Sequence, residues 1–170
     1  MSMIQSFEPI VNASARILIL GSMPGVVSLE ANQYYAHSRN AFWPIMASIF
    51  RFDVDATYDN RVESLKASGV ALWDVLHACI RTGSLDSAIV TGSRVPNDFC
   101  AFFNEHPDIK LVGFNGAEAE KSFLRYVQPK LELDGIEFVR LPSSSPAHAV
   151  ALDKKIDAWR KALKVQRFAV

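Results

Sequence analysis

Residues 16–25 read Arg-Ile-Leu-Ile-Leu-Gly-Ser-Met-Pro-Gly, an apolar run that ends in a turn between two glycines. Three further runs, at 70–75, 110–114 and 136–141, have the length and apolar content of buried strands. The first, third and fourth runs are apolar almost throughout, which is typical of parallel strands covered on both faces. Together the four runs predict a central four-stranded, mostly parallel β-sheet.

Helical patterns lie between and after these runs. The expected helices span 42–52, 58–68, 97–105, 118–128 and about 146–165. Ser145 would cap the last helix, and Pro146 would fit its first turn. Strands that alternate with helices give a parallel sheet with helices on both faces. The predicted fold class is therefore α/β, a three-layer α/β/α sandwich, and the length of 170 residues predicts one domain, residues 1–170.

Charge is balanced over the whole chain, with 18 Lys and Arg against 18 Asp and Glu. This balance argues mildly against nucleic acid as a partner, because phosphate binding usually needs a basic surface. The last expected helix is nevertheless basic; its cations are Lys154, Lys155, Arg160, Lys161, Lys164 and Arg167. They could contact phosphate, or they could form an ordinary solvated helix face.

The apolar runs are too short to cross a bilayer, and the N-terminus lacks the pattern of a secretion signal. Cys79 and Cys100 lie in apolar surroundings without metal-ligand spacing, which predicts two buried free thiols. We therefore expect a cytoplasmic protein without membrane contact. The candidate loops offer no clustered Cys, His or carboxylate set, so no metal and no other cofactor is expected.

Two loops carry the side chains best suited to chemistry. Residues 34–43 read Tyr-Tyr-Ala-His-Ser-Arg-Asn-Ala-Phe-Trp, and residues 141–149 read Leu-Pro-Ser-Ser-Ser-Pro-Ala-His-Ala. Loops after parallel strands are where α/β proteins place their sites. These two loops hold aromatics, amides, hydroxyls and imidazoles but almost no carboxylates. That inventory suits a flat, neutral, hydrogen-bonding ligand such as a nucleobase.

Several residues in and near these loops have both a structural and a functional interpretation. Asn40 could cap the helix that follows it, or it could use a neutral amide that both donates and accepts. Asn115 could form an Asn-Gly turn, or it could read a base edge from the end of its strand. Asp74, at the end of the second strand, could orient groups of the site, or it could have a cap or turn role. The serines at 143–145 could bind phosphate, while a nucleophilic pair with His148 lacks the usual Gly-x-Ser-x-Gly context.

Taken together, these segments resemble the uracil-DNA glycosylase superfamily, in particular its hypoxanthine (deoxyinosine) branch. Residues 21–25 are similar to the first motif of the superfamily, and residues 141–147 are similar to its second motif. Residues 35–43 resemble the segment that follows the first motif in the mismatch-type and hypoxanthine branches. Residues 72–74 and 114–116 also lie at the expected strand ends. The resemblance spans nearly the whole chain and implies the glycosylase fold.

The resemblance implies roles for individual residues. Asn40 would be the catalytic residue, because Met23 stands where other branches carry the acidic or amide residue that activates water. Asn115 would contact the extruded base. The implied base-binding set is Asn115, Tyr35, Phe42, Gly21, Ser22 and Met23. The implied DNA-binding set is Ser143, Ser144, Ser145, Ala147, His148 and Arg39; small Ala147 occupies the wedge position, and His148 is a candidate to fill the gap in the duplex.

The function implied is a DNA glycosylase of base excision repair. It would flip deaminated bases out of DNA and hydrolyse their N-glycosidic bonds, leaving abasic sites. Hypoxanthine is the expected base, with uracil and xanthine as further candidates. The expected partner is double-stranded DNA, with single strands as an alternative, and a monomer is expected. Two rival functions fit the same loops: a non-catalytic damaged-DNA-binding domain, and a small-molecule α/β nucleotide-binding enzyme.

Overall fold

A four-stranded sheet forms the centre of the structure, a computed structural model that describes residues 2–166. Its strands are β2 (Ile17–Gly21), β3 (Val70–Asp74), β6 (Leu111–Asn115) and β7 (Glu137–Leu141). They lie in the order β3-β2-β6-β7, and every neighbouring pair is parallel. The four predicted strands are therefore confirmed, and this sheet is wholly parallel.

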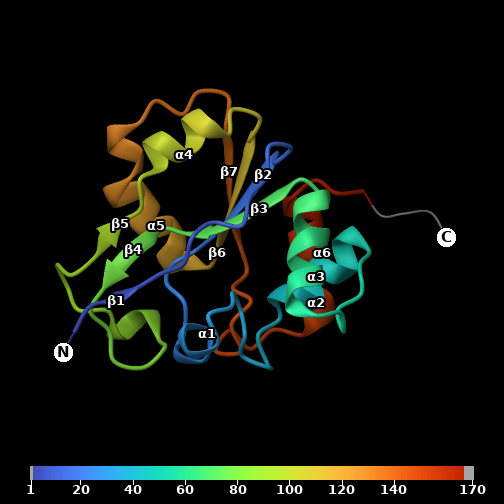
Figure 1. Ribbon diagram of the computed structural model, residues 1–170, viewed down its shortest axis with the longest axis horizontal. Coiled ribbons are helices and arrows are strands. Elements are labelled where there is room, and N and C mark those ends of the chain that lie inside the picture. Colours follow the sequence, from blue (N-terminus) through green and yellow to red (C-terminus); the bar gives the residue numbers. More distant parts are fainter. Residues whose placement is uncertain (1, 167–170) are drawn as a thin grey trace.

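Helices cover both faces of the sheet (Figure 1). One face carries α2 (Phe42–Phe50), α3 (Tyr58–Ala67) and α6 (Leu152–Ala162). The other face carries α4 (Phe99–Glu105) and α5 (Ala117–Tyr126). Alternate residues of β2 enter the two cores: Leu18 and Leu20 pack with α4 and α5, and Ile19 packs with α2 and α6. The predicted α/β/α sandwich is confirmed.

A second, smaller sheet is antiparallel and lies outside the prediction from sequence. Its strands are β1 (Ile4–Gln5), β4 (Leu76–Cys79) and β5 (Val95–Pro96), in the order β1-β4-β5. In the sequence, β3 and β4 form one apolar run, and the chain passes from one sheet to the other at Val75. Strands β1 and β5 have two residues each, too few for an alternating pattern to mark them.

The prediction for the last helix is wrong at its start. Helix α6 begins at Leu152 rather than near Pro146, and no side chain caps it. The Ser145 carbonyl accepts from the His148 N–H (3.0 Å), which closes a turn, and from Lys155 Nζ (3.2 Å). Residues 142–151 therefore form a long loop after β7, in which Ser145 and Pro146 do not cap a helix.

The other helices follow the prediction with shifted bounds. Helix α4 starts at Phe99 rather than at 97, because the Asp98 carboxylate caps it by accepting from the Ala101 N–H (3.1 Å). Helix α5 ends before Pro129, as expected. Three short elements complete the fold: α1 (Val26–Ala31) and the 3₁₀ turns η1 (Asp86–Ala88) and η2 (Gln128–Lys130).

One expectation about surface chemistry needs correction, and a second stays a prediction. Cys79 is buried as expected, but Cys100 is exposed. Of the cations predicted for the last helix, Lys155 is buried, and Lys164, which follows the end of α6, pairs with Glu137 (2.8 Å). Lys154 and Lys161 are exposed on α6, so phosphate contact and an ordinary solvated face both stay open as predictions; Arg167 lies outside the described residues. In the range 2–166, no helix is long and apolar enough to span a membrane.

Candidate active site

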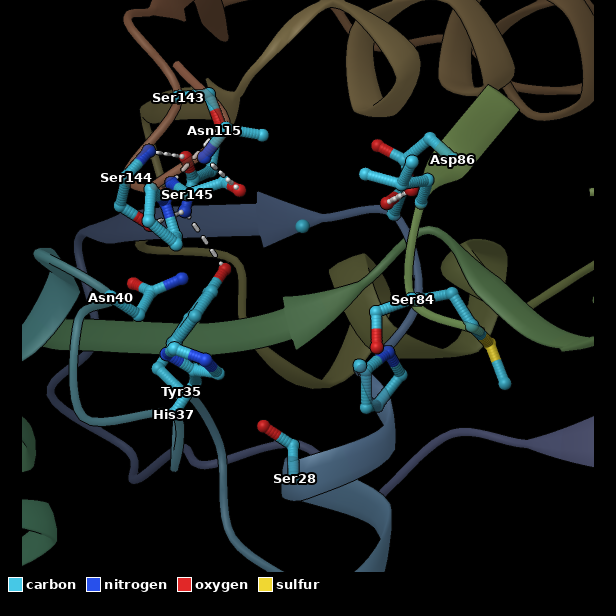
Figure 2. Close-up of a pocket in the computed structure, with 18 of the residues that line it drawn as sticks. Ser28, Tyr35, His37, Asn40, Ser84, Asp86, Asn115, Ser143, Ser144 and Ser145 are labelled. Atoms are coloured by element: carbon cyan, nitrogen blue, oxygen red, sulfur yellow. Dashed lines mark hydrogen bonds between the residues drawn. The ribbon is translucent and has the colours of Figure 1, made fainter. Parts of the chain in front are cut away.

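The carboxyl ends of the parallel strands meet at one edge of the sheet, where a cavity of about 740 Å³ opens. Gly21 ends β2 opposite Asp74 at the end of β3, and Asn115 ends β6 opposite Leu141 of β7. The loops after these strands enclose the cavity, with the serines on one side and residues 84–86 on the other (Figure 2). This edge is where parallel α/β folds bind ligands, and the volume is ordinary for such a site.

Asn40 lies at the border of this cavity, half-buried, shortly before α2. Its backbone N–H donates to the His37 carbonyl (3.0 Å), and its side-chain oxygen accepts from the Phe42 N–H (3.0 Å). These bonds hold the amide between Tyr35 and the serines in Figure 2. The Asn40 side chain therefore binds the first residue of α2, whose N-cap residue is Ala41. Its Nδ2 can still donate to a water molecule or a ligand, and the functional interpretation stays a prediction.

Tyr35 lines the cavity, and Phe42 supports it from the protein interior. The buried Phe42 ring stacks on the Tyr35 ring, with 4.3 Å between the centroids. Phe42 does not itself line the cavity, so its predicted direct contact with the base is corrected to a supporting role. Tyr35 has a φ of 54°, which is uncommon outside glycine, and its hydroxyl accepts from Asn115 Nδ2 (3.0 Å). Burial, reinforced by the Asp74 charge, raises the pKa of Tyr35, so the hydroxyl stays protonated.

Asn115 ties three segments of the site together. Its Nδ2 donates to Tyr35 Oη (3.0 Å) and to Ser144 Oγ (2.8 Å), and its Oδ1 accepts from the Ser144 N–H (2.9 Å). Ser144 is only 1% exposed, and its carbonyl accepts from the Ala41 N–H (2.9 Å). Both amide protons of Asn115 are thus engaged, which leaves one lone pair of Oδ1 to accept from a ligand.

The serine loop, residues 142–148, is anchored to α6. The Pro142 carbonyl accepts from Trp159 Nε1 (2.8 Å), and the Ser145 carbonyl accepts from Lys155 Nζ (3.2 Å). Burial lowers the pKa of Lys155. All the predicted site residues except Phe42 line the cavity: Gly21, Ser22, Met23, Tyr35, Arg39, Asn40, Asn115, Ser143, Ser144, Ser145, Ala147 and His148.

Gly21 is required by the close approach of two side chains to its backbone. A Cβ at this position would lie 2.5 Å from Asp74 Oδ1 and 2.8 Å from Tyr35 Oη. Any side chain would therefore displace the carboxyl and the hydroxyl from their places in the cavity. The neighbouring Ser22 is also fixed, because its hydroxyl donates to Asp86 Oδ1 (2.6 Å).

Two carboxyl groups reach the cavity from outside the two predicted loops. Asp74 is 4% exposed and ends β3, and its Oδ2 has no hydrogen-bond partner within residues 2–166. Burial raises the pKa of Asp74 to about 7; the nearby charge of Asp86 adds to this shift, and Arg81 opposes it. Below that pH, Asp74 is a neutral carboxylic acid that can both donate and accept a hydrogen bond.

Sequence reasoning missed the wall formed by Ser84, Leu85 and Asp86. These residues follow β4 in a segment that has no recognisable motif. Their position depends on Arg81, a buried side chain that donates to the Gly83 carbonyl (2.8 Å) and to the Pro24 carbonyl. The arginine that directly follows the apolar residues 78–80 was the one available signal. Within residues 2–166, no three His, Cys, Asp or Glu side chains come together as a metal-binding group.

The fold and the cavity define a class of protein, a parallel α/β sandwich that presents neutral amides and a stacked tyrosine where its strands end. The family model described as the uracil DNA glycosylase superfamily matches residues 8–167. The chain belongs to that superfamily.

Two curated relatives and one solved structure are similar to nearly the whole chain. A hypoxanthine DNA glycosylase from Methanosarcina barkeri (strain Fusaro / DSM 804) is 37% identical over 161 residues, which cover 94% of this chain and 98% of the relative. A protein of the same name from Methanosarcina acetivorans is 33% identical, over 91% of this chain and 94% of the relative. The solution structure of a candidate uracil DNA glycosylase from Methanosarcina acetivorans superposes with a TM-score of 0.77 at 29% identity, covering 95% of this chain and 99% of that one.

Proposed function

We propose that this chain is a monofunctional DNA glycosylase of base excision repair that accepts a flipped deaminated base in the cavity and hydrolyses its N-glycosidic bond. The observation that carries this proposal is the position of Asn40, a pre-oriented neutral amide at the border of a cavity shared with Asn115 and the serine loop. The superfamily membership and the names of the curated relatives support it. Hypoxanthine is the proposed preferred base, and uracil and xanthine are further candidates.

Breaking the bond gives an oxocarbenium-like sugar and a negatively charged base, by analogy with glycoside hydrolysis. An uncharged amide is a poor proton acceptor, so the proposed role of Asn40 is to orient the attacking water. The free lone pair of Asn115 Oδ1 suits a ring N–H of the base, which hypoxanthine, xanthine and uracil all offer. Protonated Asp74 can donate a hydrogen bond to the charge that develops on the leaving base.

The proposed product is an intact strand with an abasic site. Strand cleavage by a lyase mechanism needs an amine nucleophile. The amine beside the serine loop, Lys155 Nζ, donates to the Ser145 carbonyl, and Lys155 does not line the cavity. We also propose that residues 1–170 form one glycosylase domain that acts as a monomer in the cytoplasm. The cavity is complete within a single chain, and free Cys79 and Cys100 suit a reducing compartment.

The test is base release from duplexes that contain hypoxanthine, uracil, xanthine or only normal bases, followed by alkaline cleavage of any abasic product. We expect release from the deaminated duplexes, fastest from hypoxanthine, and none from normal DNA. Selective binding without release would instead assign the chain to non-catalytic damage binding. Indifference to DNA with saturable binding of a free nucleotide would assign it to small-molecule chemistry.

Base release should slow as the pH rises through about 7, because Asp74 loses its proton and becomes unable to donate to the leaving base. Asp74→Asn keeps a donor at this place at every pH and should flatten the profile. Single-turnover rates between pH 5.5 and 8.5, in both proteins, check this expectation; the pH limits are about 1.5 units on either side of the Asp74 pKa. A wild-type profile that the substitution leaves unchanged would contradict the assignment.

The same ionisation should appear in stability. The pKa of Asp74 is about 7 in the folded state and about 4 in an unfolded chain. Between these values the folded state binds more protons than the unfolded state, so stability falls as the pH rises through this window. Unfolding free energies from denaturant titrations should show this fall in the wild type and a smaller one in Asp74→Asn.

A further inference from the structure

The rim of the cavity carries apolar side chains that the proposed chemistry does not use. Val26 and Val27 at the start of α1 are 39% and 41% exposed, and Leu85 on the opposite loop is 60% exposed. Within residues 2–166, Leu85 is the most exposed of the large apolar side chains. A single exposed leucine is common on protein surfaces, but three such side chains around one cavity mark a contact surface.

Leu85 is exposed although its backbone is anchored on both sides. Ser84 Oγ accepts from the Val26 N–H (2.9 Å), and Asp86 Oδ1 accepts from the Ser22 hydroxyl (2.6 Å). The Leu85 carbonyl itself, just before η1, accepts from the N–H of Ala88, the last residue of η1 (3.0 Å). Figure 2 shows Ser84 and Asp86 across the cavity from the serines. The loop thus presents the leucine outward on a fixed backbone rather than on a loose one.

Among the described residues that line the opposite side of the rim, none is a large exposed aliphatic side chain; Val150, 39% exposed, follows the serine loop but does not line the cavity. The exposed residues of the serine loop there include small Ala147 and polar His148. Removing a base from the stack leaves a base-sized gap in the duplex. Proteins that distort DNA fill such gaps with apolar side chains such as leucine.

We propose that Leu85 enters the DNA stack at the place vacated by the flipped nucleotide, from the wall opposite the serine loop. This inference rests on the proposed glycosylase function. The side chain that fills the gap in the duplex, here called the wedge, is thereby assigned to the loop of residues 84–86 rather than to Ala147 or His148 in the serine loop. In this arrangement Val26 and Val27 lie beside the inserted leucine and contact the sugars of the neighbouring nucleotides.

The test compares single-turnover release of hypoxanthine from two duplexes that differ only opposite the lesion. One carries cytosine there, and the other carries an abasic analogue, which leaves the stack already open. Leu85→Ala should slow release from the paired duplex roughly tenfold to hundredfold and leave release from the opened duplex nearly unchanged. Leu85→Met restores the bulk and should recover the paired rate. The matched control is Leu124→Ala, a substitution of an exposed leucine on α5 outside the cavity, which should change neither rate.

The outcomes separate this inference from the proposed function. If the wild-type protein releases base and Leu85→Ala matches it on the paired duplex, or slows both duplexes equally, the wedge assignment is wrong. The same holds if His148→Ala alone shows the selective loss. If the wild type releases no base at all, the glycosylase proposal fails. A 2-aminopurine base placed beside the lesion then still tests the insertion of Leu85, because its fluorescence rises when the stack is opened. The wild-type protein should raise this fluorescence, and Leu85→Ala should not.

Discussion

Asn40→Ala should lose most base release, roughly 100- to 1000-fold in single-turnover rate, while the fold stays intact. The substitution removes the amide that is held against the cavity by the Phe42 N–H. The other amide that lines the cavity, Asn115, uses its Nδ2 protons on Tyr35 and Ser144 and cannot replace it. Water would still reach the sugar, but it would no longer be oriented for attack.

The structural cost of Asn40→Ala should be small. One half-exposed hydrogen bond to the Phe42 N–H is lost, which is worth about 1 kcal/mol. Thermal unfolding should therefore shift only slightly, and binding to a hypoxanthine duplex should persist. Asn60→Ala, a substitution on the exposed surface of α3, serves as the control and should keep full activity. Near-normal release by Asn40→Ala would overturn the catalytic assignment.

Asn115→Ala should have the second-largest effect, because it acts on activity and stability together. It removes three hydrogen bonds and leaves the N–H and hydroxyl of buried Ser144 without these partners. A buried unsatisfied polar group costs about 1–3 kcal/mol, which should be visible as a lower unfolding free energy. Tyr35 and the serine loop would also lose the side chain that hydrogen-bonds to both of them. Their positions should then shift, and small misplacements of reacting groups cost about 100-fold in rate.

The selectivity of Asn115→Ala distinguishes a base-reading role from a purely structural one. If the Oδ1 lone pair accepts the ring N–H of the base, the ratios of the rates for hypoxanthine, xanthine and uracil should change. If Asn115 only ties the loops, all three rates should fall by the same factor. Rates for the three duplexes, measured beside thermal unfolding, decide between these outcomes, and unchanged ratios would contradict the base-reading role.

The parallel sheet and the pairing of its loops could be predicted because both depend on local patterns. The run at 17–20 is apolar throughout, and parallel strands bring their carboxyl ends to one edge, which predicts that the loops after these strands lie at the same edge of the sheet. The start of α6 could not be predicted in this way. The Ser145-Pro146 signal is local, whereas the carbonyl of Ser145 is bound by Lys155, ten residues further along the chain.

The wall at residues 84–86 shows a different limit of sequence reasoning. Its three side chains follow no periodicity, and their place at the cavity is determined by hydrogen bonds to Val26 and Ser22, about sixty residues away. Burial likewise decides the chemistry of Asp74, whose pKa is raised to about 7. A sequence identifies a carboxylate but cannot reveal how completely tertiary packing removes it from water.

In the proposed mechanism, an uncharged amide at residue 40 directs water to the sugar of a flipped deaminated nucleotide. Mass spectrometry of a hypoxanthine duplex after incubation with the protein detects both products of this step. We predict free hypoxanthine together with an uncut strand in which a hydroxyl has replaced the base, formed by the wild type and largely absent with Asn40→Ala. A strand of unchanged mass, a broken strand, or equal product from Asn40→Ala would refute this mechanism.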